Sequence, residues 1–173
     1  MVLGEENDTK IEFDDMRFEI QLSPFQSSGN EEYVLLDTGC VLALLRRFRR
    51  FWHRVEKDML TIAILEINIE EVAEHLSKSQ DTLIQKGFPI FSIRNAIENL
   101  RKIIQDDRIR KVANPLIPEK AFLAFEHFRE DRLLAYALTE GKFKAVATQD
   151  KKLVQRLGEH KCISCDHLWE AQI

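Results

Sequence analysis

The chain has 173 residues, of which 45% are hydrophobic and 31% are charged, proportions typical of one globular domain with a sizeable core. No apolar stretch approaches the roughly 20 residues of a membrane-spanning helix, and we do not expect the acidic, polar amino terminus to be a secretory signal, so we expect a cytoplasmic protein without a membrane partner. A net charge of −4 argues against a nucleic-acid partner on average, although RRFRRFWHR at 46–54 concentrates positive charge.

The three cysteines are an odd number, which argues against a disulfide framework and favours a reducing compartment. Cys162 and Cys165 form a C-x-x-C pair, but no second pair completes a zinc site. The flanking His160 and His167 match no common zinc spacing. We interpret KCISC as a short strand in which the sulfur atoms fill apolar space.

Residues 1–32 are predicted to be an N-terminal extension that precedes a main domain at 33–173. Apolar and polar residues alternate at 16–22 with the period of a half-buried strand. Residues 11–13 favour a partner strand, with the turn near 14–15. Because the apolar strip needs cover, we expect this strand to pack on the main domain or on a second subunit.

The main domain is predicted to alternate strands with helices, because buried apolar runs alternate with apolar residues at helical spacing. In chain order we expect a strand at 33–37, a helix at 41–55, a strand at 59–65, helices at 67–86 and 93–104, a proline-bracketed loop at 114–118, helices at 119–128 and 131–140, a strand at 143–148, a helix at 149–158 and a strand at 162–164. This order predicts an α/β fold, a three-layer α/β/α sandwich around a central, mostly parallel sheet.

Several carboxylates lie where these elements meet. Asp37 closes the first strand, Asp131 opens a helix, and Asp150 follows a strand by two residues, while Glu70 and Glu71 lie early in a helix. Each alone is consistent with a helix N-cap or a solvated first turn. In a parallel sheet, however, strand ends and the following helix starts share one edge. Carboxylates gathered there repel one another unless a cation such as Mg²⁺ or Mn²⁺ binds them.

Three segments of the chain resemble the PIN-domain nucleases: VLLDTGCVL, EDRLLAYALTEGKFKAVATQDKKL and, less strongly, INIEEVAEHL. The second segment, with its D-x-x-L-A-x-A helix, glycine, short strand and T-x-D, carries most of the resemblance, which covers about 33–170. The resemblance implies a PIN-like fold and a metal-dependent endoribonuclease that hydrolyses RNA phosphodiester bonds with Mg²⁺ or Mn²⁺. Its partners would be RNA and either an antitoxin or a ribosome-assembly protein, and it could form a homodimer.

The same resemblance assigns roles to residues. Asp37, Asp131 and Asp150 match the catalytic acids that hold the metal, and Thr148 matches the polar residue before the last acid. Setting INIEEVAEHL against the family pattern I-T-x-x-E-L aligns Glu71 with the fourth catalytic acid. Glu70 is the alternative, because shifting the register by one residue exchanges the two.

One position departs from the family pattern. Relatives usually have Ser or Asn where this chain has Gly39, so a polar side chain near the metal is lost. The departure supports an alternative function, a catalytically degenerate PIN fold that binds RNA or a protein without cutting. A phosphatase with Asp37 as its nucleophile is disfavoured, because such enzymes carry D-x-D. Within the family, a toxin of a toxin–antitoxin pair and an RNA-processing nuclease both remain open.

The basic segment at 46–54 has two interpretations. It is either the solvated face of an amphipathic helix, with Phe48 and Trp52 turned inward, or a surface that holds the RNA backbone. An acidic cluster repels phosphate, so a local positive surface would help to admit RNA. The RNA-binding residues of the second interpretation are Arg46, Arg47, Arg49, Arg50 and Arg54.

Overall fold

The computed structural model describes residues 7–13, 16–87 and 91–170. Its centre is a five-stranded sheet with the order β5-β4-β3-β6-β7, in which every neighbouring pair is parallel. The strands are β3 (Val34–Leu36), β4 (Ile62–Leu65), β5 (Arg110–Val112), β6 (Ala145–Ala147) and β7 (Cys162–Ile163). A separate antiparallel hairpin consists of β1 (Asn7–Phe13) and β2 (Met16–Leu22).

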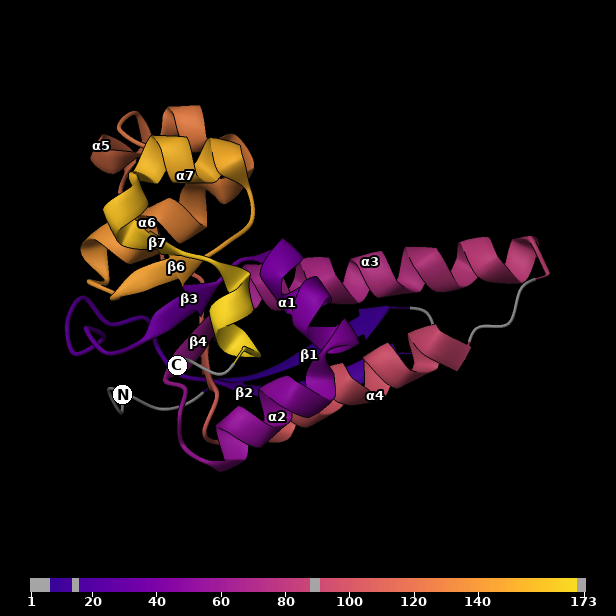
Figure 1. Cartoon of the computed structure of the whole chain (residues 1–173). Helices are drawn as coiled ribbons and strands as arrows, with labels where there is room; N and C mark the ends of the chain where they lie inside the picture. The colour runs from indigo at the N-terminus through magenta and orange to yellow at the C-terminus, as the bar shows by residue number, and fades with distance from the viewer. Residues whose placement is uncertain (1–6, 14–15, 88–90, 171–173) are drawn as a thin grey trace.

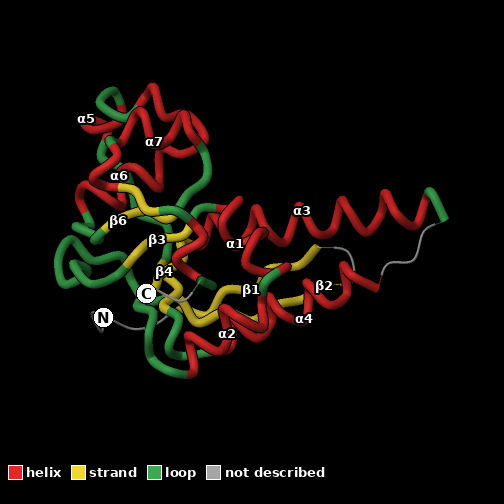
Figure 2. Tube along the Cα trace, in the orientation of Figure 1, coloured by secondary structure: helices red, strands yellow, loops and turns green. Residues whose placement is uncertain are grey.

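The helices form two groups around the sheet. They are α1 (Thr38–Arg46), α2 (Phe48–Glu56), α3 (Glu66–Gln85), α4 (Phe91–Gln105), α5 (Glu119–Phe122), α6 (Arg132–Glu140) and α7 (Lys151–Leu157), with short 3₁₀ turns η1 (Glu126–Asp131), η2 (Glu159–Lys161) and η3 (Cys165–Leu168). Helices α5 to α7 gather at the upper left of Figure 1, while α3 and α4 extend to the right beyond the sheet. The hairpin lies between these two long helices and contacts both (Figure 2).

The two faces of the sheet bury two hydrophobic clusters, because successive strand side chains point to opposite faces. On one face, Leu36, Ile64 and Ala147 pack against the group α1 to α4, η3 and the hairpin. On the other face, Leu35 and Val146 pack against η1, α6 and α7. The predicted three-layer α/β/α sandwich around a parallel sheet is therefore confirmed.

The predicted strand at 16–22 is confirmed as β2, and its partner strand as β1. Ile20 and Leu22 are buried in the same hydrophobic cluster as α1 to α4, so the hairpin packs on the same chain. The turn expected near 14–15 lies outside the described residues, as does the break expected at 88–90.

The prediction of one helix at 41–55 is wrong. Asp37 caps α1, so helix begins at Thr38, and it ends at Arg47, whose N–H donates to the Leu44 carbonyl three residues back. A second helix, α2, then begins at Phe48. Because the break resets the helical phase, α2 buries Phe51 completely. Phe48 and Trp52, which were expected to turn inward, pack against the core but remain partly exposed.

Two further predictions differ from the structure. Strand β5 was not expected, because its three residues, Arg-Lys-Val, lack an apolar run, yet Lys111 and Val112 are both buried at this edge of the sheet. The expected helix at 119–128 is also wrong, because α5 covers only Glu119–Phe122 and the 3₁₀ turn η1 follows. Within η1, Arg129 has a left-handed backbone with a φ of 47°, a conformation that disfavours a regular helix before α6.

The remaining elements lie close to their predicted positions. Strand β4 begins three residues later than expected, at Ile62, and α6 ends at Gly141 as predicted. A Cβ at Gly141 would lie 2.5 Å from the Ala137 carbonyl oxygen, so only glycine fits there. Within the described ranges, no helix combines the length and the apolarity that crossing a membrane requires.

Candidate active site

The sheet reverses its strand order between β3 and β6. From β3 the chain moves outward to β4 and β5, and it then returns to the other side of β3 through β6. Asp37 follows β3 directly, and its backbone N–H donates to the Ala147 carbonyl at the end of β6, at 3.3 Å. In open parallel sheets, ligand sites lie in the crevice at such a switch point, beyond the carboxyl ends of the strands.

The carboxylate of Asp37 is buried, with 8% of the residue exposed. Its Oδ1 accepts a hydrogen bond of 2.7 Å from the Cys40 N–H, and its Oδ2 accepts one from the Thr148 hydroxyl. Burial raises the pKa of Asp37, the charges of Asp150 and Glu71 raise it further, and the two hydrogen bonds oppose this rise. Asp37 is therefore both the N-cap of α1 and a member of a group of repelling carboxylates.

Asp150 and Thr148 follow β6 and meet Asp37 across the switch point. The Thr148 hydroxyl, which donates to Asp37, accepts a hydrogen bond of 3.0 Å from the Asp150 N–H. Asp150 caps α7 through Oδ1, which accepts from the N–H groups of Lys152 and Leu153. Asp150 therefore serves as a helix cap and at the same time contributes charge to the carboxylate group.

Asp131 differs from the other two aspartates. It stands at the N-cap position of α6, but its side chain accepts no capping hydrogen bond. Burial raises the pKa of Asp131 to about 6, together with the charges of Asp150, Asp37 and Glu71. The helix-cap explanation therefore does not account for this half-buried carboxylate.

The fourth acid of the cluster comes from α3. The Thr38 hydroxyl donates to Glu71 Oε2 at 2.5 Å, and the Asn68 side-chain amide donates to the Thr38 hydroxyl at 3.0 Å. The charge of Glu71 acts on Asp37 and Asp131. Burial raises the pKa of Glu70, and the charges that add to this rise belong to Glu66 and Glu71. The structure thus places Glu71 among the aspartates, whereas Glu70 interacts with its own helix.

The sequence analysis missed two residues of this site, Thr38 and Asn68. Both had a signal in the sequence, because Thr38 follows Asp37 directly and Asn68 lies one helical turn before Glu71. Their hydrogen bonds fix the orientation of the Glu71 carboxylate.

The donor set has the chemistry of a hard-cation site, although among the described residues no three of its carboxylates bring oxygen atoms within 4.8 Å of one another. Its members are the carboxylates of Asp37, Glu71, Asp131 and Asp150, which interact electrostatically. Mg²⁺ and Mn²⁺ prefer such oxygen ligands. Beside them, Asn68 is 95% buried, and its Oδ1 has no hydrogen-bond partner, so an uncompensated oxygen adds to the negative character of the site.

A second group of potential ligand atoms shares Asp37. Its carboxylate, Cys40 Sγ and Cys165 Sγ are buried and lie within 4.8 Å of one another. The two sulfur atoms are joined as a disulfide, however, and soft metals require free thiolates. This group therefore does not fit a zinc site.

The structure contains one disulfide that the sequence analysis, which argued against a disulfide framework, did not anticipate. Cys40 at the start of α1 is bonded to Cys165 at the start of η3, 125 residues along the chain, with the Cα atoms 5.6 Å apart. The argument against a framework relied on the odd number of cysteines, which does not reveal a pairing between distant segments. Cys162 remains a free thiol, and burial raises its pKa.

The five arginines predicted to bind RNA lie away from the carboxylates, at the other end of α1 and along α2. Arg46, Arg47, Arg49 and Arg50 are exposed. Arg54 is only 7% exposed, and its Nη1 donates to the backbone carbonyl of Glu170 at 3.0 Å. Since α1 has nine residues, its rise of about 1.5 Å per residue separates this cluster from Asp37 by roughly 13 Å.

Comparison with known proteins gives a similar fold. No family model matches the chain, and no curated protein matches it. A solved structure, the crystal structure of PAE2754 from Pyrobaculum aerophilum, superposes with a TM-score of 0.58 at 21% sequence identity, covering 80% of this chain and 92% of that chain. At this level of identity the similarity concerns the fold alone, and it agrees with the α/β sandwich described above.

The raised pKa of Asp131 predicts a pH-dependent stability in the metal-free protein. Because folding raises this pKa from 3.8 to about 6, the folded state binds the proton more tightly, and the resulting stabilisation is lost as the pH rises through 6. Asp131→Asn removes the ionised form that folding disfavours, so it should stabilise the protein more at pH 7.5 than at pH 4. The free energy that corresponds to the pKa shift is reduced by solvent around the half-buried group, and we expect the two stabilisations to differ by about 1 kcal/mol. Urea denaturation with chelator present measures this, with Glu126→Gln as the control, an exposed acid of η1 that is not among the charges raising the pKa of Asp131. Equal effects of Asp131→Asn at both pH values would contradict the prediction.

Proposed function

We propose that the protein is a PIN-type endoribonuclease that hydrolyses RNA phosphodiester bonds with Mg²⁺ or Mn²⁺. The observation that carries this proposal is the electrostatic coupling of four acids beside the switch point of a parallel sheet: the N-cap aspartates of α1, α6 and α7, and Glu71 of α3. Asp131 also supports this proposal, because its half-buried carboxylate makes no capping hydrogen bond and its pKa is raised to about 6. The motifs that resemble the PIN family contain these same four acids.

Each residue has a separate part in the proposed reaction. Asp37, Asp131 and Asp150 would hold the cation, which supplies stabilisation of phosphoryl charge and activation of water when it is bound. The Thr148 hydroxyl and the Cys40 N–H fix the two oxygens of Asp37. The Thr38 hydroxyl engages Glu71 Oε2, so Oε1 is the atom available to accept a proton from the attacking water.

A cleavage assay tests the proposal. RNA with a 5′ label is incubated with the protein and either Mn²⁺, Mg²⁺ or EDTA, and the termini of the products are analysed. We expect cleavage with either cation, none with EDTA, and products with 5′-phosphate and 3′-hydroxyl ends. Cleavage in EDTA, or products ending in a cyclic phosphate, would contradict metal-dependent hydrolysis by this site.

The alternative, a PIN fold that binds without cutting, depends on Gly39. This glycine is exposed in the first turn of α1, and a Cβ there would lie 3.8 Å from Asp37 Oδ1, an ordinary contact. Serine therefore fits at this position and would place a hydroxyl beside the carboxylate. If the missing polar group limits the site, Gly39→Ser should tighten the apparent Mn²⁺ affinity in the cleavage assay by about tenfold.

Gly39→Ala is the matched control for this substitution. Both variants remove the helix cost of glycine, roughly 0.5–1 kcal/mol, but only serine adds a hydroxyl. Equal Mn²⁺ affinities in the two variants would mean that Gly39 does not limit the site. A protein that cuts RNA only as Gly39→Ser would instead favour the binding alternative.

A further inference from the structure

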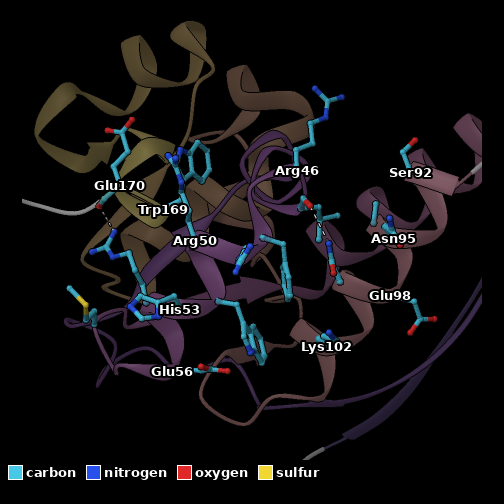
Figure 3. A pocket seen from close by; sticks show the side chains of 18 residues that line it. Arg46, Arg50, His53, Glu56, Ser92, Asn95, Glu98, Lys102, Trp169 and Glu170 are labelled. Carbon is cyan, nitrogen blue, oxygen red and sulfur yellow. Dashed lines mark hydrogen bonds between the residues drawn. The ribbon is translucent and has the colours of Figure 1, made fainter.

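A groove on the helical side of the molecule is not part of the carboxylate site. It runs between α2 and α4, is bounded by the last turn of α1 and by Trp169 and Glu170, and has a volume of about 1710 Å³. Figure 3 shows Arg50, His53 and Trp169 on the left of the groove and Asn95 and Lys102 on the right. Pockets for small molecules measure about 300–1,000 Å³, so this open groove suits a longer ligand.

The groove carries an excess of positive charge in a chain whose net charge is −4. The cationic side chains lining it are Arg46, Arg49, Arg50, Arg54 and Lys102, and the acidic ones are Glu56, Glu98 and Glu170. Of these acids, Glu98 lies 3.7 Å from the Arg101 guanidinium. The carboxylate of Glu170 points away from the groove in Figure 3. The free charge that faces a ligand is therefore mostly positive.

Arg54 gives an independent indication of an anionic ligand. It is 93% buried in the wall of the groove, one guanidinium nitrogen donates to the Glu170 carbonyl, and the buried Nε has no hydrogen-bond partner. Among the described residues, no carboxylate forms an ion pair with it. A buried charge without a counter-charge is costly, and an anion bound in the groove would offset that cost.

Aromatic rings lie beside the cations. Phe48 and Trp52, on one side of α2, are stacked with ring centroids 5.2 Å apart and an interplanar angle of 24°, and both line the groove. Proteins that bind single strands combine a basic groove with aromatic rings against which bases stack. An acidic peptide would use the cations but would gain less from the rings.

We propose that this groove binds single-stranded RNA, with phosphates on its arginines and bases against the exposed parts of Phe48 and Trp52, whose ring faces contact each other, Lys102 and Arg108. The inference deepens the proposed ribonuclease activity and rests on it for the identity of the ligand. Because α1 separates the groove from Asp37 by roughly 13 Å, an RNA strand that occupies both sites must cross this distance in addition to the length of the groove. The substrate class is thus a polynucleotide strand rather than a dinucleotide.

Binding in the absence of cleavage tests the groove separately from the reaction. Fluorescein-labelled U12 RNA is titrated with the protein in EDTA, and anisotropy is followed over a series of NaCl concentrations. Arg49→Gln/Arg50→Gln removes two exposed groove charges without touching the buried Arg54. Each phosphate contact contributes about −0.7 to the slope of log affinity against log salt concentration. Losing two contacts should therefore flatten this slope by about 1.4, and affinity near 0.1 M salt should fall about tenfold or more.

Lys78→Gln/Lys86→Gln is the matched control, because it removes the same charge from exposed positions of α3 and its C-cap, outside the groove. We expect this control to bind U12 with the wild-type slope. Equal losses in both double variants, no loss in either, or no U12 binding by the wild type would overturn the proposal. It would also be overturned if a labelled polyglutamate peptide bound more tightly than U12 and lost affinity on Arg49→Gln/Arg50→Gln. Groove-dependent RNA binding by a protein that fails to cut with Mn²⁺ would support the groove and reject the ribonuclease function.

Discussion

Asp150→Asn is expected to lower the rate of RNA cleavage with Mn²⁺ by about 100-fold or more while leaving the fold intact. The substitution removes one negative charge from the proposed cation site, and cation binding contributes several kcal/mol to stabilising the transition state, at 1.36 kcal/mol per tenfold in rate. The fold should survive, because asparagine caps a helix as well as aspartate does. Its side-chain oxygen can still accept from the Lys152 and Leu153 N–H groups.

The choice of Asp150 over Asp37 follows from their hydrogen bonds. Asp37 accepts on both carboxylate oxygens, from Cys40 and from Thr148, so an amide there would disturb a buried network as well as the charge. Glu130→Gln is the control, since this exposed acid neighbours Asp131 but lies outside the four-acid group. Rates within threefold of each other for wild type and Asp150→Asn, at equal thermal stability, would exclude Asp150 from the reaction.

The RNA cleavage assay also distinguishes which acid of α3, Glu70 or Glu71, belongs to the site. Glu71 accepts from Thr38 and acts on the pKa of Asp37 and Asp131, whereas Glu70 interacts with Glu66 and Glu71. Glu71→Gln should therefore reduce the cleavage rate strongly and Glu70→Gln only slightly. The reverse order would show that the sequence register is shifted by one residue.

The features that could be predicted from sequence were those encoded locally. The apolar runs before Asp37 and Asp150 were sufficient to predict adjacent parallel strands and carboxylates at one edge. The alternation of apolar and polar residues at 16–22 was sufficient to predict β2. It reflects a strand with one buried face, on which Ile20 and Leu22 lie. Each of these signals is a periodicity or a charge within a few residues of the element that it predicts.

The features that were missed depend on contacts between distant segments. Strand β5 pairs with β4 on one side and with Ser23, which follows β2, on the other, while its own residues favour no strand. The break at Arg47 separates α1 from α2, although the apolar residues of the two helices continue one helical spacing in the sequence. No local pattern indicated the 3₁₀ turn before Asp131 or the absence of a capping hydrogen bond from its side chain.

The pairing of Cys40 with Cys165 is the largest of these long-range features, and its removal is expected to have the largest effect on stability. The bond closes a loop across 125 residues, and the chain-entropy estimate for a loop of this length is about 4–5 kcal/mol. Reduction of the wild type should lower the free energy of unfolding by about that amount. Urea denaturation with and without a phosphine reductant measures the difference.

Two variants make this experiment specific. Cys162→Ser removes the half-buried free thiol and should show the same loss on reduction as the wild type, whereas Cys165→Ala should start from the lower stability and not respond to reductant. An unchanged wild-type curve in reductant would mean that both cysteines are thiols and that the expectation from the cysteine count holds. Because Asp37 accepts from the backbone N–H of Cys40 rather than from its sulfur, reduction should leave the proposed cleavage activity unchanged wherever the protein stays folded. The disulfide would then stabilise the start of α1 without taking part in the chemistry.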